Sequence, residues 1–127
     1  MLNSLTLNSQ GSYNVLGQFD FVSVHIYPET GKTNQALETL RKFAVGKPVV
    51  IEETFPLSCS AADLKAFLLG SRRYASGWIG HYNGETVGEL EALQHSEKIT
   101  LQQTVWLAWL QLFRETGPEF SALTPDH

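Results

Sequence analysis

The sequence has little of several features that define whole classes of protein. It contains one cysteine, Cys59, in 127 residues, so no disulfide can form within the chain and the redox compartment stays open. No apolar stretch approaches the roughly 18 residues of a membrane-spanning helix. Residues 1–18 also lack the basic start and apolar run of a signal peptide. We therefore expect no membrane partner and leave the localisation open.

Positive charge is also scarce. Nine Lys and Arg stand against 13 Asp and Glu, which gives a formal net charge of −4 at pH 7. The basic residues are scattered, whereas nucleic-acid binding requires clustered positive charge. Hydrophobic residues make up 43% and charged residues 17%, a composition typical of a globular domain. We expect a globular chain with no nucleic-acid partner.

Strand-like and helix-like segments alternate along the chain. Residues 1–18 are polar and rich in Gly, Ser and Asn, and we expect an irregular segment there. The expected strands span 19–28, 47–55 and 75–82, and the expected helices span 33–46, 60–74 and about 100–115, with a polar, acidic loop over 83–98. Alternation at this spacing predicts an α/β fold with a parallel sheet and right-handed crossovers, in a single domain over 1–127.

Local signals predict the ends of the helices. Thr33 is the expected N-cap of the first helix and Gly46 its end, while Ser60 and Asp63 form a near capping box before the second. Gly117 and Pro118 are expected to end the last helix. An apolar stripe on that helix is interpreted as core packing: Leu101, Val105, Trp109, Leu112 and Phe113.

The first strand grows polar toward its end. Period-two geometry places Val22, Val24 and Ile26 on one face and Phe19, Phe21, Ser23, His25 and Tyr27 on the other. In α/β barrels, functional side chains gather where strands end. His25 and Tyr27 therefore either orient a carboxylate or bind a sugar hydroxyl, or they satisfy each other in a half-buried core.

Two adjacent carboxylates follow the apolar run of the second strand. Burying Glu52 or Glu53 without a partner costs free energy, so neither is expected to serve stability, although both could be solvated at the start of a loop. Adjacent strand residues point to opposite faces, so we expect the pair not to flank one bond. Glu53, alternating with Val49 and Ile51, is expected to face the barrel mouth near Tyr27, and Glu52 the helical layer or the rim.

The segments DFVSVHIYP, KPVVIEETF and GWIGHY, in this order with helices between them, resemble strands six, seven and eight of the retaining glycoside hydrolase barrels of the cellulase and β-mannanase clan. The resemblance implies a partial (β/α)₈ barrel of about three βα units, over 19–127. It implies that Glu53 is the nucleophile, that Tyr27 hydrogen-bonds it, and that His25 lines the sugar site. Trp78 and His81 are the remaining candidates for substrate binding, with His81 standing where the clan usually has a Trp.

One part of the clan's machinery has no counterpart in the chain. The clan's acid/base lies in an Asn-Glu pair on strand four, which Asn83, Gly84 and Glu85 do not reproduce. Retaining hydrolysis requires two carboxyl groups about 5–5.5 Å apart. The expected function is therefore a fragment of a retaining β-glycosidase that acts on an oligo- or polysaccharide without a cofactor. The isolated chain is expected to be inactive, and either to self-associate or to complete a missing N-terminal half-barrel.

Other functions remain open. The chain could be a non-catalytic half-barrel that binds carbohydrate or assembles with a partner, since its sheet edges and apolar face would require association. A lyase or aldolase would need a Lys at a strand end, but Lys47 starts its strand. His25, Glu53 and His81 could in principle bind a metal from three strand ends, although no metal-ligand spacing is present.

Overall fold

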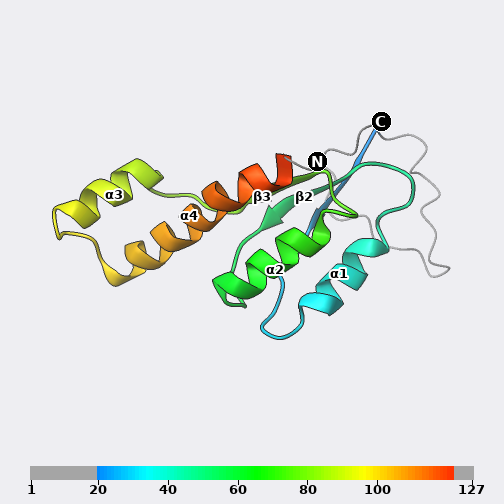
Figure 1. Cartoon of the computed structure of the whole chain (residues 1–127), viewed down its shortest axis with the longest axis horizontal. Helices are drawn as coiled ribbons and strands as arrows, with labels where there is room; N and C mark the ends of the chain where they lie inside the picture. The colour runs from blue at the N-terminus through cyan, green and yellow to red at the C-terminus, as the bar shows by residue number, and fades with distance from the viewer. Residues whose placement is uncertain (1–19, 122–127) are drawn as a thin grey trace. The chain divides into compact units, whose positions relative to one another are not determined.

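The computed structural model describes residues 20–121, which form an α/β fold with a three-stranded parallel sheet and four helices (Figure 1). The elements are β1 (Val22–His25), α1 (Thr33–Arg41), β2 (Val49–Thr54), α2 (Ala61–Ser71), β3 (Gly77–Gly80), α3 (Val87–His95) and α4 (Leu101–Ser121). The irregular segment expected over 1–18, and Phe19, lie outside the described residues. The chain divides into two compact units, with the boundary between His81 and Tyr82.

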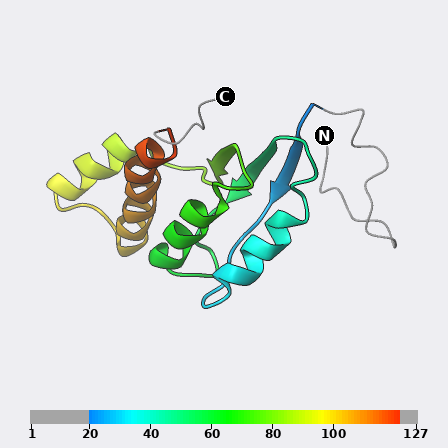
Figure 2. The same ribbon diagram turned by 45° about the vertical axis from the view of Figure 1, so that its right-hand side comes forward.

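The first unit contains the sheet, whose strands are ordered β1-β2-β3. Figures 1 and 2 show α1 and α2 side by side against it. The side chains between the helices and the sheet are buried: Val22, Val24, Val49 and Ile51 from the strands, and Leu40, Leu64, Phe67 and Leu68 from the helices. Burial of each such side chain contributes about 1.5–3 kcal/mol, so this layer holds the unit together. The prediction of an α/β fold with a parallel sheet is confirmed.

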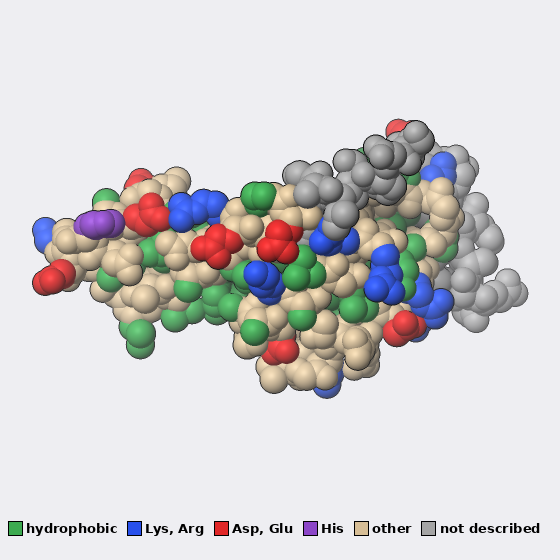
Figure 3. Space-filling view, in the orientation of Figure 1, with side chains coloured by type: hydrophobic (Ala, Val, Ile, Leu, Met, Phe, Trp, Pro, Cys, Tyr) green, Lys and Arg blue, Asp and Glu red, His purple; other side chains and the backbone are tan. Residues whose placement is uncertain are grey.

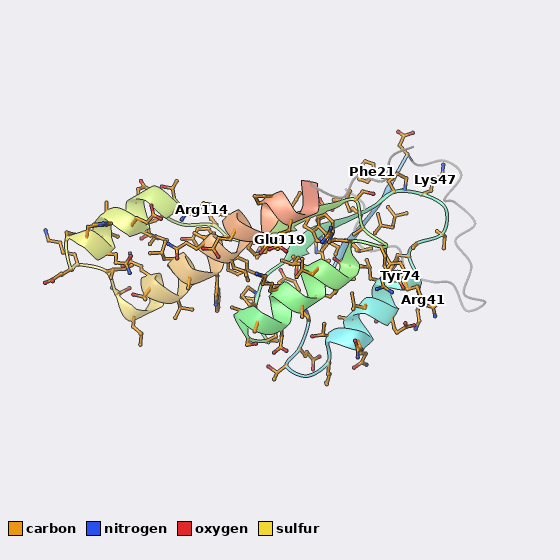
Figure 4. The ribbon with its side chains drawn as sticks, viewed as in Figure 1. Phe21, Arg41, Lys47, Tyr74, Arg114 and Glu119 are labelled. Atoms are coloured by element: carbon orange, nitrogen blue, oxygen red, sulfur yellow. The ribbon has the colours of Figure 1, made fainter. Side chains whose placement is uncertain are left out.

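The opposite face of the sheet is exposed. Phe21, which immediately precedes β1, is 53% exposed, and Ile79 of β3 is 55% exposed. Both lie on the face away from the helices, because Val22 is buried beneath the helices and Gly77 pairs with Val50 rather than with Ile51. Figure 4 labels Phe21 and Lys47, which precede β1 and β2 at the end of the sheet where the strands begin.

The helix boundaries in the first unit follow local signals only in part. The capping box of α2 is confirmed, because Ser60 Oγ accepts from Asp63 N at 3.0 Å and the Asp63 carboxylate accepts from Ser60 N. The prediction for α1 was right that the helix begins at Thr33, but it was wrong about the N-cap and about the C-terminal end. Lys32, not Thr33, is the N-cap, and the helix ends at Arg41 rather than at Gly46. Tight turns after Arg41 close the helix early, and Gly46 lies beyond them at φ +87°.

The second unit contains a helix where the sequence predicted a loop. The segment expected as a loop over 83–98 includes α3, which begins with a capping box between Thr86 and Glu89. This Thr-x-x-Glu pattern is a helix-start signal, and the acidic composition around it obscured the signal. Leu90 of α3 and Leu107 of α4 are both buried, which accounts for the packing of the two helices.

The last helix is longer than predicted. α4 continues through Gly117 and Pro118 to Ser121, because Pro118 removes only one backbone donor, close to the helix end. The expected core stripe is also partly wrong, since Leu101 is 84% exposed and Val105 is 39% exposed. No helix within residues 20–121 is long and apolar enough to cross a membrane.

Candidate functional site

An irregularity in β2 brings two carboxylates to the same part of the sheet. Val24 of β1 pairs with Ile51, but the next residue, His25, pairs with Glu53, so β2 contains one extra residue at Glu52. Such a bulge breaks the strict alternation of side chains. Buried positions along β2 accordingly run Val49, Ile51 and Thr54, leaving Glu52 and Glu53 both outside the core.

The bulge changes which side of the sheet Glu53 faces. Glu53 was expected to share a face with Val49 and Ile51, but both of these are fully buried beneath the helices and Glu53 is not. Glu53 reaches Tyr27, as predicted, because of the bulge. The expectation that Glu52 and Glu53 point to opposite faces was wrong, since both carboxylates approach the same His25 ring.

Three strands contribute to the surroundings of Glu53. Its Oε1 accepts a hydrogen bond from the Tyr27 hydroxyl, which lies two residues beyond the end of β1. Its Oε2 lies 3.3 Å from His25 Nδ1 and 3.6 Å from His81 Nδ1. His81 directly follows β3, and its backbone N donates to Thr54 O at 2.9 Å, which places the residue beside β2. The predicted nucleophile is thus flanked by three of the four predicted substrate-binding residues.

The contacts of Glu53 favour its ionised form. The hydrogen bond from Tyr27 is the largest effect and holds the pKa of the Glu53 carboxyl below its usual value. Burial opposes it, and His81 and His25 add smaller electrostatic effects that lower the pKa. Burial, together with the hydrogen bond to Glu53 and its charge, raises the pKa of Tyr27 to about 12. At neutral pH the site therefore pairs a carboxylate with a protonated phenol that donates to it.

Glu52 and Ser23 extend this arrangement in a way that the sequence did not predict. Ser23 Oγ donates to Glu52 Oε2 at 2.5 Å, and the same carboxylate oxygen lies 3.9 Å from His25 Nε2. The first contact depends on the register between the strands, in which Ser23 pairs with Val50, two residues before Glu52. The second contact depends on the bulge, for which the sequence contained no signal.

Trp78 does not join these residues. Its indole Nε1 donates to Ser71 Oγ at 2.7 Å, and Ser71 is a buried residue of α2. Trp78 also pairs with Ile51, whose side chain is buried on the helical side of the sheet. The structure therefore places Trp78 between the sheet and α2, and its role in substrate binding stays a prediction that this position does not favour.

A cavity of about 280 Å³ adjoins the site. Its lining comes from the end of β1, the following loop and α1: His25, Ile26, Tyr27, Glu29, Lys32, Gln35, Ala36 and Thr39. Lys32 Nζ and Glu29 Oε2, 2.5 Å apart, make this lining polar. Within residues 20–121, no group of three or more His, Cys, Asp or Glu side chains is arranged to hold a metal ion.

Charge is mixed on the surface, with acidic and basic side chains interspersed on the face that Figure 3 presents.

No protein-family model matches the sequence, and no curated protein or solved structure matches the chain. The interpretation of the site consequently depends on the strand-end residues and their geometry.

Proposed function

We propose that the chain carries the nucleophile-bearing part of a retaining β-glycoside hydrolase, with Glu53 as the nucleophile. The observation that supports this most is the position of the Glu53 carboxylate. It lies at the C-terminal end of the central strand, accepts from the Tyr27 hydroxyl, and is approached by imidazoles from both neighbouring strands. The C-terminal ends of parallel strands are where α/β barrels place their catalytic groups.

The surroundings of Glu53 suit a nucleophilic carboxylate. A nucleophilic carboxylate must be ionised, and the hydrogen bond from Tyr27 keeps the pKa of Glu53 low. One of its oxygens would form a bond to the anomeric carbon of a sugar while the bond from that carbon to the leaving oxygen breaks. Water would then attack the same carbon and release Glu53. The two imidazoles and the polar cavity would contact sugar hydroxyls.

The fold supports a barrel fragment through the face that it leaves exposed. α1 and α2 cover one face of a parallel sheet, as in a (β/α)₈ barrel, while the other face exposes Phe21 and Ile79. In a closed barrel such side chains fill the interior, and closure removes the two free sheet edges. We infer that the described βα units belong with further strands, supplied by a missing half-barrel or by another copy of the chain.

The general acid would have to come from those further strands. Glu52 is the nearest other carboxylate with contacts to the site. Its Oε2 already accepts a hydrogen bond from Ser23 Oγ and lies beside His25 Nε2, on the side of the ring away from Glu53. Without an acid, a natural leaving sugar must depart as an alkoxide, and the loss of general acid catalysis alone costs about 10²–10⁴-fold in rate. Hydrolysis of β-1,4-glucans and mannans by the chain alone is therefore expected to stay at background.

An activated substrate avoids this requirement and provides the test. We would incubate the chain with 2,4-dinitrophenyl 2-deoxy-2-fluoro-β-glucoside and the corresponding mannoside, whose phenolate leaves without protonation. Attack by Glu53 forms a glycosyl ester and releases the phenolate. Because the 2-fluoro substituent destabilises the oxocarbenium-like transition state for attack of water on this ester, the ester should accumulate. Intact-mass measurement should show one added glycosyl group, and peptide mapping should locate it at Glu53.

Two matched variants control the labelling. Glu53→Gln should abolish the added mass, whereas Glu52→Gln removes the adjacent carboxylate and should still be labelled. Labelling at another residue, or equal labelling of the Glu53→Gln variant, would contradict the proposal. A chain that neither reagent labels, even at millimolar concentration, would equally argue against Glu53 as a nucleophile.

A further inference from the structure

The His25 imidazole lies between two carboxylates. Its Nδ1 is 3.3 Å from Glu53 Oε2 and its Nε2 is 3.9 Å from Glu52 Oε2. Ser23 holds Glu52 in this position through a 2.5 Å hydrogen bond. The two carboxylates come from adjacent residues of β2, and only the bulge allows both to reach one ring.

This arrangement creates a competition for one proton. A neutral imidazole has one N–H donor and one acceptor nitrogen, and an ionised carboxylate only accepts. In the tautomer with the proton on Nδ1, His25 presents a donor to Glu53 and a lone pair to Glu52. In the other tautomer these roles are exchanged. A ring with two protons would present a donor to both carboxylates.

We propose that Glu52 is a positioning residue that acts on Glu53 through His25. By attracting the ring proton toward Nε2, Glu52 determines how often Glu53 Oε2 faces a donor and how often it faces a lone pair. Other groups near the ring are the Tyr27 hydroxyl and His81, which contact Glu53 directly, and Glu29 and Lys32, which line the same cavity and pair with each other.

The consequence for chemistry rests on the proposed function of Glu53. A carboxylate oxygen that accepts fewer hydrogen bonds is more basic and is a stronger nucleophile. With Oε1 bound to the Tyr27 hydroxyl, Oε2 is the oxygen whose reactivity depends on His25 and His81. Glu52 would thus adjust the reactivity of Glu53 without touching the substrate.

Tautomer populations can be measured directly on the whole chain. Long-range ¹H–¹⁵N correlation spectra separate protonated from unprotonated ring nitrogens, and a His25→Asn variant identifies the His25 signals among the four histidines. The spectra would be recorded at a pH at which the ring signals show the neutral form. Glu52→Gln should increase the Nδ1–H tautomer of His25, and Glu53→Gln should increase the Nε2–H tautomer.

Two further variants make the result specific. Ser23→Ala releases Glu52 and should shift the populations in the same direction as Glu52→Gln, by a smaller amount. Glu29→Gln removes a carboxylate that lines the cavity but pairs with Lys32, and it should change nothing. Unchanged tautomers in both Glu52→Gln and Ser23→Ala, or a shift toward Nε2–H, would overturn the proposal. This readout is independent of glycosyl labelling, so the failure of either proposal can be recognised separately.

Discussion

Replacing Glu53 by Gln should lower the pKa of Tyr27 from about 12 part of the way toward 10.0, the ordinary value of a tyrosine phenol. The difference of about two units corresponds to a roughly 100-fold smaller ionisation constant. Burial of the phenol is the largest cause, followed by the hydrogen bond to Glu53 and the charge of Glu53. The variant removes the charge and the ionic acceptor but leaves the burial, so an intermediate pKa is expected.

The measurement is a pH titration of the tyrosine ring signals by ¹³C NMR. The chain has four tyrosines, and a Tyr27→Phe variant identifies the signal that belongs to Tyr27. A value near 10 in the unaltered chain would mean that the phenol is neither buried nor bonded to Glu53. A value that stays near 12 in Glu53→Gln would mean that the carboxylate does not influence it. Either result would refute the geometry from which the proposed nucleophile is argued.

The same contact predicts how stability depends on pH. The pKa of Tyr27 is raised on folding, so its contribution to stability is present below pH 10 and is lost as the pH rises toward about 12. The pKa of Glu53 is lowered on folding, so its contribution is present above the ordinary value of 4.5 and is lost as the pH falls through the lower folded-state value. Tyr27→Phe removes the largest cause of the second shift and should make the chain less sensitive to acid.

Three further changes test the packing. Thr54 is fully buried and its hydroxyl has no hydrogen-bond partner among the described residues. Thr54→Val should therefore raise the free energy of unfolding by about 1 kcal/mol in chemical denaturation. A loss of stability would show that the hydroxyl does form a hydrogen bond. Ser71→Ala removes a buried hydroxyl that accepts a hydrogen bond from Trp78 and donates one to Leu68 O. It should lower the free energy of unfolding by about 1–3 kcal/mol in the same assay. An unchanged denaturation midpoint would contradict these two hydrogen bonds. Sedimentation should show self-association that Phe21→Ser weakens, whereas a compact monomer with cooperative unfolding would argue against an exposed barrel interior.

Features that depend on a few consecutive residues were predictable from the sequence. The alternation along β1 correctly separated the buried Val22 and Val24 from Ser23 and His25, because successive strand residues face opposite sides. The start of α2 was also predicted, because a capping box involves residues only three positions apart. The same kind of signal was present before α3, where the acidic composition led to a wrong prediction of a loop.

The contacts of the candidate site were decided by tertiary structure. Glu53 was predicted at its end of the second strand, but the argument from alternation would have buried it with Val49 and Ile51. The bulge at Glu52 changes this, and it arises from pairing between β1 and β2, segments more than twenty residues apart in the chain. The contacts of His25 with both carboxylates follow from the same pairing. The direction of Trp78 toward α2 follows from the pairing of β3 with β2. The sequence by itself determined which residues stand at the strand ends, because strand ends are local. Only the register between strands decided which of those side chains meet.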